Sequence, residues 1–247
     1  MAGKIYLVAT PIGNLEDITL RAIRILKEVD IIICEDTRQT LKLLNHFDIS
    51  KPLISFHRHS TEGRLEEIIN KVESGNNVAL VSDAGTPAIS DPGEDLVKMA
   101  IEKNLEIVPI PGPCALISAL IVSGIDTREF TFLGFLPLNK KLRKQKLNDI
   151  KMANKTIILY EAPHKLQETL KDLQEITQKR KIVLAREITK IHEQYIAGTA
   201  TELLNKIIDP KGEFVIVIDK SEEDEKNIFE NMNIEEHYKY YENKRIW

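Results

Sequence analysis

The chain has 247 residues and a formal net charge of −4; 43% of its residues are hydrophobic and 29% are charged. This balance excludes a largely disordered chain and predicts a soluble globular protein of one large domain or two modest ones. No apolar run approaches the roughly 20 residues that cross a bilayer, and the N-terminal segment lacks the features of a secretion signal, so we expect a cytoplasmic protein without a membrane partner.

Short runs of Ile, Val and Leu alternate with segments of helical period, which predicts an α/β fold with largely parallel strands. In the first half we expect helices between strands, and the predicted strands are residues 5–9, 31–34, 53–56, 78–82 and 106–110. One helix carries an apolar stripe from Ile18 to Val29. Another begins near Ser60 or Thr61 and stops at Gly75.

Prolines and a glycine at residues 111–113 interrupt the chain and precede an apolar segment, residues 114–122. This pattern predicts a helix that is buried on every side, and we place the junction between two halves here. The second half repeats the alternation, with strands at 130–136, 156–160, 182–185 and 214–218 and helices at 164–176 and 201–207. The predicted domains are therefore residues 1–112 and 113–220, followed by a charged tail, 221–247. Cys34 and Cys114 lie in apolar runs and are expected to be buried, reduced thiols.

Ligands of open α/β sheets bind at the carboxyl ends of the strands, so the loops there are candidates for a site. The loop at residues 8–14 lacks the G-x-G-x-x-G spacing, which disfavours dinucleotide binding, and a plain tight turn explains it equally well. The loop at residues 34–38 contains Glu35, Asp36 and Arg38. A helix cap with a surface ion pair explains those charges as well as a catalytic role does.

The loop at residues 81–93 is rich in small residues that let a ligand approach the backbone, and Asp83 and Thr86 can bond polar groups. Its acidic spacing does not match an EF-hand, so no metal site is expected. The loop at residues 109–114 directs the N-terminus of a helix, with its unpaired N–H groups, at whatever lies beside it.

Two segments of the second half, 160–165 and 185–190, place polar residues at strand ends, although a histidine such as His164 is more often a cap or a surface residue than a catalyst. Because the net charge is negative, an RNA partner would need a local basic patch. A solvated helix face is the default interpretation of the one dense group of cations, which consists of Lys140, Lys141, Arg143, Lys144 and Lys146.

Several stretches, in this order, resemble the tetrapyrrole methylase-like superfamily and its branch of small-subunit ribosomal RNA methyltransferases: YLVATPIGNLEDITLRA, CEDTR, VALVSDAGTPAISDPG, PIPGPCALISALIVSG, FLGFLP, LYEAPHKL, AREITKIHEQ and GEFVIVI. The resemblance runs from about Ile5 to Asp219. Porphyrin and precorrin methylases of that superfamily carry a G-x-G-P-G-D loop after the first strand. Residues 9–14 read ATPIGN instead, which favours the RNA branch.

The resemblance implies two α/β domains of the class III methyltransferase type, a ligand cleft between them, and a homodimer. It implies that S-adenosylmethionine donates a methyl group to the ribose 2′-oxygen of a cytidine in the decoding region of 16S rRNA, in the small subunit or 30S particle. By analogy with the superfamily, the residues that line the donor pocket would be Ile12, Asp83, Thr86, Cys114, Ala115 and Tyr160.

Loss of the hydroxyl proton during methyl transfer needs an acceptor within hydrogen-bond reach. The candidates are Glu35, Asp36 and Glu161, with Arg186 as an orienting group because arginine stays protonated. The basic group at residues 140–146 is the expected RNA contact. Two other classes stay open: a small-molecule C-methyltransferase acting on tetrapyrroles, and a non-catalytic RNA-binding or ribosome-assembly factor.

Overall fold

The computed structural model describes residues 1–57, 62–91, 93–207 and 210–221, and most of the predicted tail lies outside them. The chain divides into two compact units. The first contains Met1–Ser118 together with Glu187–Gln194, and the second contains Ala119–Arg186 together with the described residues that follow Gln194. A short segment from late in the sequence therefore belongs to the first unit.

The first unit is built on a parallel sheet with the strand order β3-β2-β4-β1-β5. The strands are β1 (Lys4–Val8), β2 (Ile31–Cys34), β3 (Leu53–Ser55), β4 (Val78–Leu80) and β5 (Glu106–Ile110). All of these strands were predicted, and three predicted ends run one or two residues too far. The run Ile31–Cys34 is continuously apolar because helices cover both faces of the sheet.

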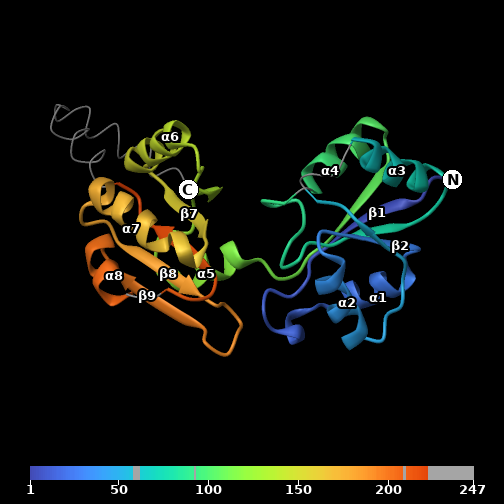
Figure 1. Cartoon of the computed structure of the whole chain (residues 1–247), viewed down its shortest axis with the longest axis horizontal. Helices are drawn as coiled ribbons and strands as arrows, with labels where there is room; N and C mark the ends of the chain where they lie inside the picture. The colour runs from blue at the N-terminus through green and yellow to red at the C-terminus, as the bar shows by residue number, and fades with distance from the viewer. Residues whose placement is uncertain (58–61, 92, 208–209, 222–247) are drawn as a thin grey trace, which may run out of the picture. The chain divides into compact units, whose positions relative to one another are not determined.

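Helices α1 (Leu20–Glu28) and α2 (Thr37–His46) cover one face, and α3 (Glu62–Glu73) and α4 (Gly93–Glu102) cover the other (Figure 1). Ile32 packs in the α1 and α2 core, whereas its neighbour Ile33 packs in the α3 and α4 core. The connections from β1 through β3 run toward one edge and those from β3 to β5 run back, so right-handed crossovers place the two helix pairs on opposite faces.

The neighbouring strands β1 and β4 therefore send their chains to opposite faces of the sheet. The chain leaves β1 through a short 3-10 helix, η1 (Leu15–Asp17), to α1 on one face, and it leaves β4 to α4 on the other face. Ligands of open α/β sheets bind at such a switch point, outside the carboxyl ends of the strands. The topology thus selects the loops after β1 and β4 as the place to look for a site.

The second unit has a mixed sheet with the order β6-β7-β10-β8-β9, in which β10 is antiparallel to both neighbours. Its strands are β6 (Phe130–Phe135), β7 (Thr156–Glu161), β8 (Ile182–Arg186), β9 (Gln194–Gly198) and β10 (Phe214–Ile218). The expectation of largely parallel strands is therefore confirmed for the first sheet and wrong for the second. Strand β9 was not predicted, because QYIAG is a half-exposed edge strand without a run of Ile, Val or Leu.

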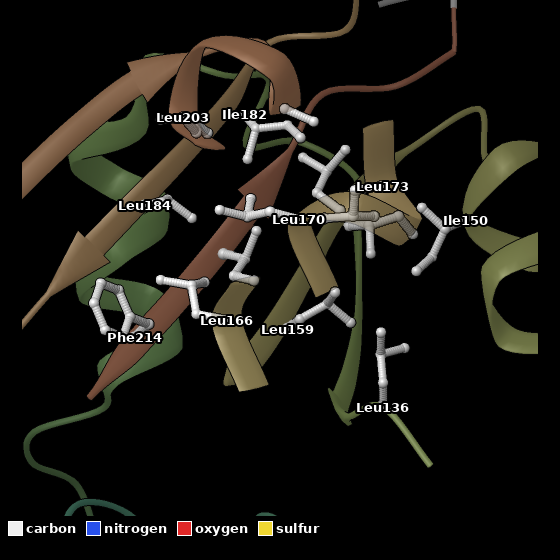
Figure 2. Packing of buried hydrophobic residues seen from close by; sticks show 14 of the residues in the cluster. Leu136, Ile150, Leu159, Leu166, Leu170, Leu173, Ile182, Leu184, Leu203 and Phe214 are labelled. Carbon is white, nitrogen blue, oxygen red and sulfur yellow. The ribbon is translucent and has the colours of Figure 1, made fainter. Parts of the chain in front are cut away.

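The core of the second unit lies between this sheet and the helices α6 (Lys140–Lys151), α7 (Pro163–Thr177) and α8 (Ala200–Lys206). Figure 2 shows Leu166, Leu170 and Leu173 of α7 pointing toward side chains of the sheet such as Leu159 and Leu184. Helix α7 begins at Pro163, a residue that suits the first turn of a helix.

Helix α5 (Ala115–Ser123) is apolar at nearly every position, and the expectation that it is buried on every side is wrong. Leu116 and Leu120 are buried, but Ile117 is 43% exposed and Ile121 is 70% exposed. An apolar helix without a polar face offers no periodicity from which to tell its faces apart. Cys34 is buried as expected, whereas Cys114 is only partly buried. None of the helices in the described ranges is long and apolar enough to span a membrane.

Candidate functional site

The loops after β1 and β4 are joined at the switch point. The Thr10 N–H donates to the Gly85 carbonyl at 2.9 Å, and the Gly85 N–H donates to the Thr10 carbonyl at 3.0 Å. The buried hydroxyl of Thr10 also donates to the Ser82 carbonyl at 3.2 Å. Because these bonds satisfy the backbone groups of Thr10 and Gly85, they hold the two loops together.

The loop after β5 contacts the loop after β4. The Thr86 hydroxyl donates to the Pro113 carbonyl at 3.0 Å. Gly85 has a φ of +82°, and a Cβ added there would lie 3.1 Å from Ile12 Cγ2 and 3.6 Å from the Pro113 oxygen. Cys114 and Ala115 follow, where α5 begins and its first N–H groups have no acceptor inside the helix. Three separate stretches of small residues therefore converge around Gly85.

The loop after β2 is attached through Asp83, whose Oδ1 accepts the N–H of Asp36 at 3.0 Å. Asp36 is the N-cap of α2: its Oδ1 accepts the Arg38 N–H at 2.8 Å, and its Oδ2 forms an ion pair with Arg38 Nη2 at 2.7 Å. These bonds, chiefly those from the Arg38 side chain, lower the pKa of Asp36 to about 2. Asp36 is therefore a weak base, and the cap with a surface ion pair is what the structure shows.

The segment Glu187–Gln194 reaches the loop after β1 at Gly13. A Cβ on Gly13 would collide with Lys190 Cγ and would lie 3.0 Å from Thr189 Oγ1, so any larger residue there would require the Lys190 side chain to move. Thr189 has a φ of +67°, which is strained for a β-branched residue, and its buried Oγ1 has no hydrogen-bond partner within the described ranges. Strain and an unpaired polar atom together are typical of functional sites.

Sequence reasoning did not select Thr189 or Lys190 as site residues. Lys190 Nζ pairs with Glu187 Oε1 at 2.9 Å, which holds the segment in shape. Gly13 and Lys190 are far apart in the sequence, and no local pattern signals their contact. Only the polar character of residues 185–190 at a strand end pointed toward this region.

In the second unit, Tyr160 lies near the end of β7, with its ring centroid 4.8 Å from that of Phe132 and 5.8 Å from that of Phe135. The next residue, Glu161, is 4% exposed. Its Oε1 accepts the Ala162 N–H at 2.9 Å, and its Oε2 accepts the Thr169 hydroxyl at 2.5 Å. Both carboxylate oxygens are thus bonded within the unit.

The predicted basic group divides by its position on α6. Arg143 is 11% exposed; its Nε donates to Asp172 Oδ2 at 2.8 Å and its Nη2 donates to the Thr169 hydroxyl at 2.9 Å. Lys146 pairs with Asp149 at 3.6 Å. The other cations share one exposed helical face and are Lys140, Lys141 and Lys144. The Arg143 guanidinium is thus bonded to Asp172 and to Thr169, whose hydroxyl donates to Glu161.

The structure brings seven of the predicted site residues together on the first unit: Ile12, Glu35, Asp36, Asp83, Thr86, Cys114 and Ala115. Tyr160, Glu161 and Arg186 belong to the second unit, where Arg186 Nε donates to the Lys211 carbonyl at 2.7 Å. Over the part of the chain that the structure describes, no group of three or more His, Cys, Asp or Glu side chains is arranged to hold a metal ion.

Comparison with known proteins identifies the class. Residues 4–204 match the family Tetrapyrrole (Corrin/Porphyrin) Methylases. The fold is similar to that of diphthine synthase, with a TM-score of 0.68, 15% identity and coverage of 89% of this chain and 91% of that one. It is also similar to uroporphyrin-III C-methyltransferase of Thermus thermophilus complexed with S-adenyl homocysteine, with a TM-score of 0.63, 15% identity and coverage of 88% of this chain and 97% of that one. The fold and the match define a methyltransferase.

Much more similar sequences carry one name, ribosomal RNA small subunit methyltransferase I. The protein of Synechocystis is 50% identical over 94% of this chain and 84% of its own length. That of Bacillus subtilis is 46% identical over 98% of this chain and 85% of its own, and that of Thermotoga maritima is 44% identical over 89% and 100%. The chain therefore belongs to the tetrapyrrole methylase family and, within it, to the family of proteins named ribosomal RNA small subunit methyltransferase I.

Proposed function

We propose that this methyltransferase transfers a methyl group from S-adenosylmethionine to the ribose 2′-hydroxyl of a cytidine in the decoding region of 16S rRNA, in the cytoplasm and as a homodimer. The observation that carries the proposal is the junction of three small-residue loops around Gly85, in a chain 50% identical to a protein named for ribosomal RNA methylation. The substrate in that name and the S-adenyl homocysteine of the Thermus structure support the choice of substrate and donor.

The residues at the junction fit a sulfonium nucleoside. Ile12 supplies an apolar side chain at the junction, and the absence of a side chain at Gly85 lets Ile12 and Pro113 approach its backbone closely. The exposed carboxylate of Asp83 and the Thr86 hydroxyl can accept bonds from ribose or amino groups. The first turn of α5, at Cys114 and Ala115, offers N–H donors to a negative or neutral acceptor. Tyr160 of the second unit is the last of the residues that we propose bind S-adenosylmethionine.

When bound, S-adenosylmethionine supplies an electrophilic methyl group on a positively charged sulfur. The transfer is an in-line displacement, so the main task of the protein is alignment, which can lower a barrier by up to roughly 7 to 11 kcal/mol. The paired hydrogen bonds between Thr10 and Gly85 serve that alignment, because they hold the two loops together before either substrate binds.

The ribose hydroxyl must lose its proton during or after attack. Asp36 is a weak base, since its pKa is held at about 2, and we assign it to shaping the loop. Glu35 and Glu161 stay as candidate acceptors. For Glu161 that role requires rearrangement of its bonds to Ala162 and Thr169. Arg186 would orient a phosphate or hydroxyl group.

RNA would be held by the exposed face of α6 at Lys140, Lys141 and Lys144, with Lys146 beside it. Lysine side chains on one helical face suit a run of backbone phosphates, because each neutralised phosphate releases counterions. Arg143 would support this surface by keeping α6 attached to α7 through its ion pair with Asp172.

Radiolabelled methyl transfer tests the function directly. Purified protein and labelled S-adenosylmethionine are incubated with 30S particles from a strain that lacks the enzyme, and with 30S particles from the parent strain as control. We expect label in the 16S rRNA of the first sample only, and a nuclease-resistant dinucleotide that places the methyl group on a cytidine ribose. Label on a base, or equal label in both particles, would overturn the 2′-hydroxyl assignment.

A further inference from the structure

A cavity of the second unit is unrelated to the proposed methyl-transfer site. It has a volume of about 540 Å³ and lies where β7 and β8 begin and β10 ends. Tyr160 and Arg186 lie at the other end of the same strands, where they pair with Val215 and Phe214. At roughly 3.3 Å per residue, a five-residue strand separates the two ends by on the order of 13 Å.

The walls of this cavity are strongly cationic. They contain a single carboxylate, Asp219, and five cations, which are Lys151, Lys179, Arg180, Lys181 and Lys220. The whole chain has a net charge of −4, so this concentration of positive charge does not follow from the overall composition. A concave surface lined by one sign of charge focuses the field and attracts the opposite charge.

The Arg180 guanidinium is held in place with one nitrogen unused. Its Nε donates to the Asp219 carbonyl at 2.6 Å and its Nη1 donates to the Ile150 carbonyl at 2.7 Å. Its Nη2 is buried and has no hydrogen-bond partner within the described ranges. A buried donor without a partner costs about 1 to 3 kcal/mol, and such a group in a native fold calls for an explanation.

The favourable interaction of cations with the C-terminal end of α7 does not by itself account for the unpaired Arg180 nitrogen. Cations after the last turn of α7 do interact favourably with its carbonyl groups. That effect explains Lys179 and the position of Arg180, but it leaves Nη2 unsatisfied. Lys181 Nζ already donates to the carbonyls of Ser123 and Gly124 at 3.0 and 3.3 Å, so its position is fixed as well.

Several ammonium groups beside a fixed guanidinium are suited to phosphate, because the cations neutralise its charge and ammonium groups donate charge-assisted hydrogen bonds to its oxygens. We propose that this cavity is a phosphate-binding site that holds a backbone phosphate of the RNA substrate away from the methylated nucleotide. The RNA part rests on the proposed function, and the phosphate chemistry stands without it.

The test measures binding of inorganic pyrophosphate by calorimetry to the full chain at constant ionic strength. The test variant Lys151→Gln/Lys179→Gln removes two exposed charges at the cavity, and the matched control Lys155→Gln/Lys171→Gln removes two exposed charges of the same unit that do not line it. We expect the test variant to weaken pyrophosphate binding at least tenfold and the control to leave it within about twofold. Arg180→Lys, checked for folding by circular dichroism, should weaken it as well. Equal binding by the wild type and Lys151→Gln/Lys179→Gln would overturn the site.

A second arm identifies the source of the phosphate. Binding of a 16S rRNA fragment should weaken in Lys151→Gln/Lys179→Gln and should be competed by pyrophosphate, while the affinity for S-adenosylmethionine stays unchanged. Unchanged RNA affinity together with weakened pyrophosphate binding would overturn the RNA assignment and support a free phosphate compound. If the wild type binds pyrophosphate but methylates no 30S particle, the proposed function fails while this site stands.

Discussion

Thr10 and Gly85 donate their backbone N–H groups to each other's carbonyls, at 2.9 and 3.0 Å, although 74 residues of sequence lie between them. This pair connects the neighbouring strands β1 and β4 just beyond their carboxyl ends, where their chains diverge to opposite faces of the sheet. The proposed donor site depends on this connection, because Ile12 and Pro113 both lie against Gly85.

Gly85→Ala should weaken binding of S-adenosylmethionine. Its φ of +82° is strained for alanine by roughly 1 to 2 kcal/mol, and the new Cβ would press on Ile12 Cγ2 at 3.1 Å. We expect at least a tenfold loss of affinity by calorimetry. Gly75→Ala is the matched control, because Gly75 has a φ of +101° after the end of α3, remote from the loops around Gly85. A loss of affinity of the same size in Gly75→Ala would mean that Gly85 acts only through stability.

Asp36→Asn should retain most turnover and change the dependence of stability on pH. The folded pKa of Asp36 is about 2, below its ordinary 3.8, so its charge stabilises the fold above that ordinary value and ceases to do so as pH falls through 2. Asparagine also caps helices well, so the variant keeps the cap and loses the charge together with the bond that Oδ2 accepts from Arg38. Urea unfolding should show a less stable variant at pH 7 and a smaller difference near pH 2. A large loss of turnover with unchanged donor affinity would instead make Asp36 a catalytic residue.

Thr169→Val should destabilise the second unit by about 1 to 3 kcal/mol, since the change leaves bonds of Glu161 and Arg143 unmade inside the protein. Thr169→Ser keeps the hydroxyl and should lose much less. Denaturant unfolding at neutral pH measures both variants. Equal loss in the two would show that the methyl group of Thr169, and not its hydroxyl, is the important part.

Replacement of Lys140, Lys141 and Lys144 by glutamine should weaken RNA binding and reduce its dependence on salt. Each phosphate that the variant no longer neutralises lowers the slope of log affinity against log salt by about 0.7 to 0.9. The control replaces exposed lysines of α1, α2 and α4, namely Lys27, Lys42 and Lys98, and should preserve the slope. Filter binding with a 16S rRNA fragment between about 50 and 200 mM salt, a range over which phosphate binding is sensitive to ionic strength, measures the slope. An unchanged slope in the α6 variant would exclude that face as the RNA-binding surface.

Residues 187–194 show where prediction from sequence ended. The polar residues after β8 indicated a strand end, but nothing in the sequence tells that Lys190 and Thr189 lie against Gly13 of the first unit. Arg143 makes the same point. In the sequence it is one of five cations, and only the packing of α6 on α7 shows that its guanidinium is bonded to Asp172 and Thr169.

The sequence by itself determined the positions of nearly all strands, the α/β class and the family, because hydrophobic period and small-residue loops are local properties that each segment carries along the chain. The tertiary structure alone decided the antiparallel direction of β10, the pairing of Thr10 with Gly85, the strain at Thr189 and the cationic cavity around Arg180. These features arise between residues that are distant in sequence, and their energies depend on burial and on partners that exist only once the chain has folded.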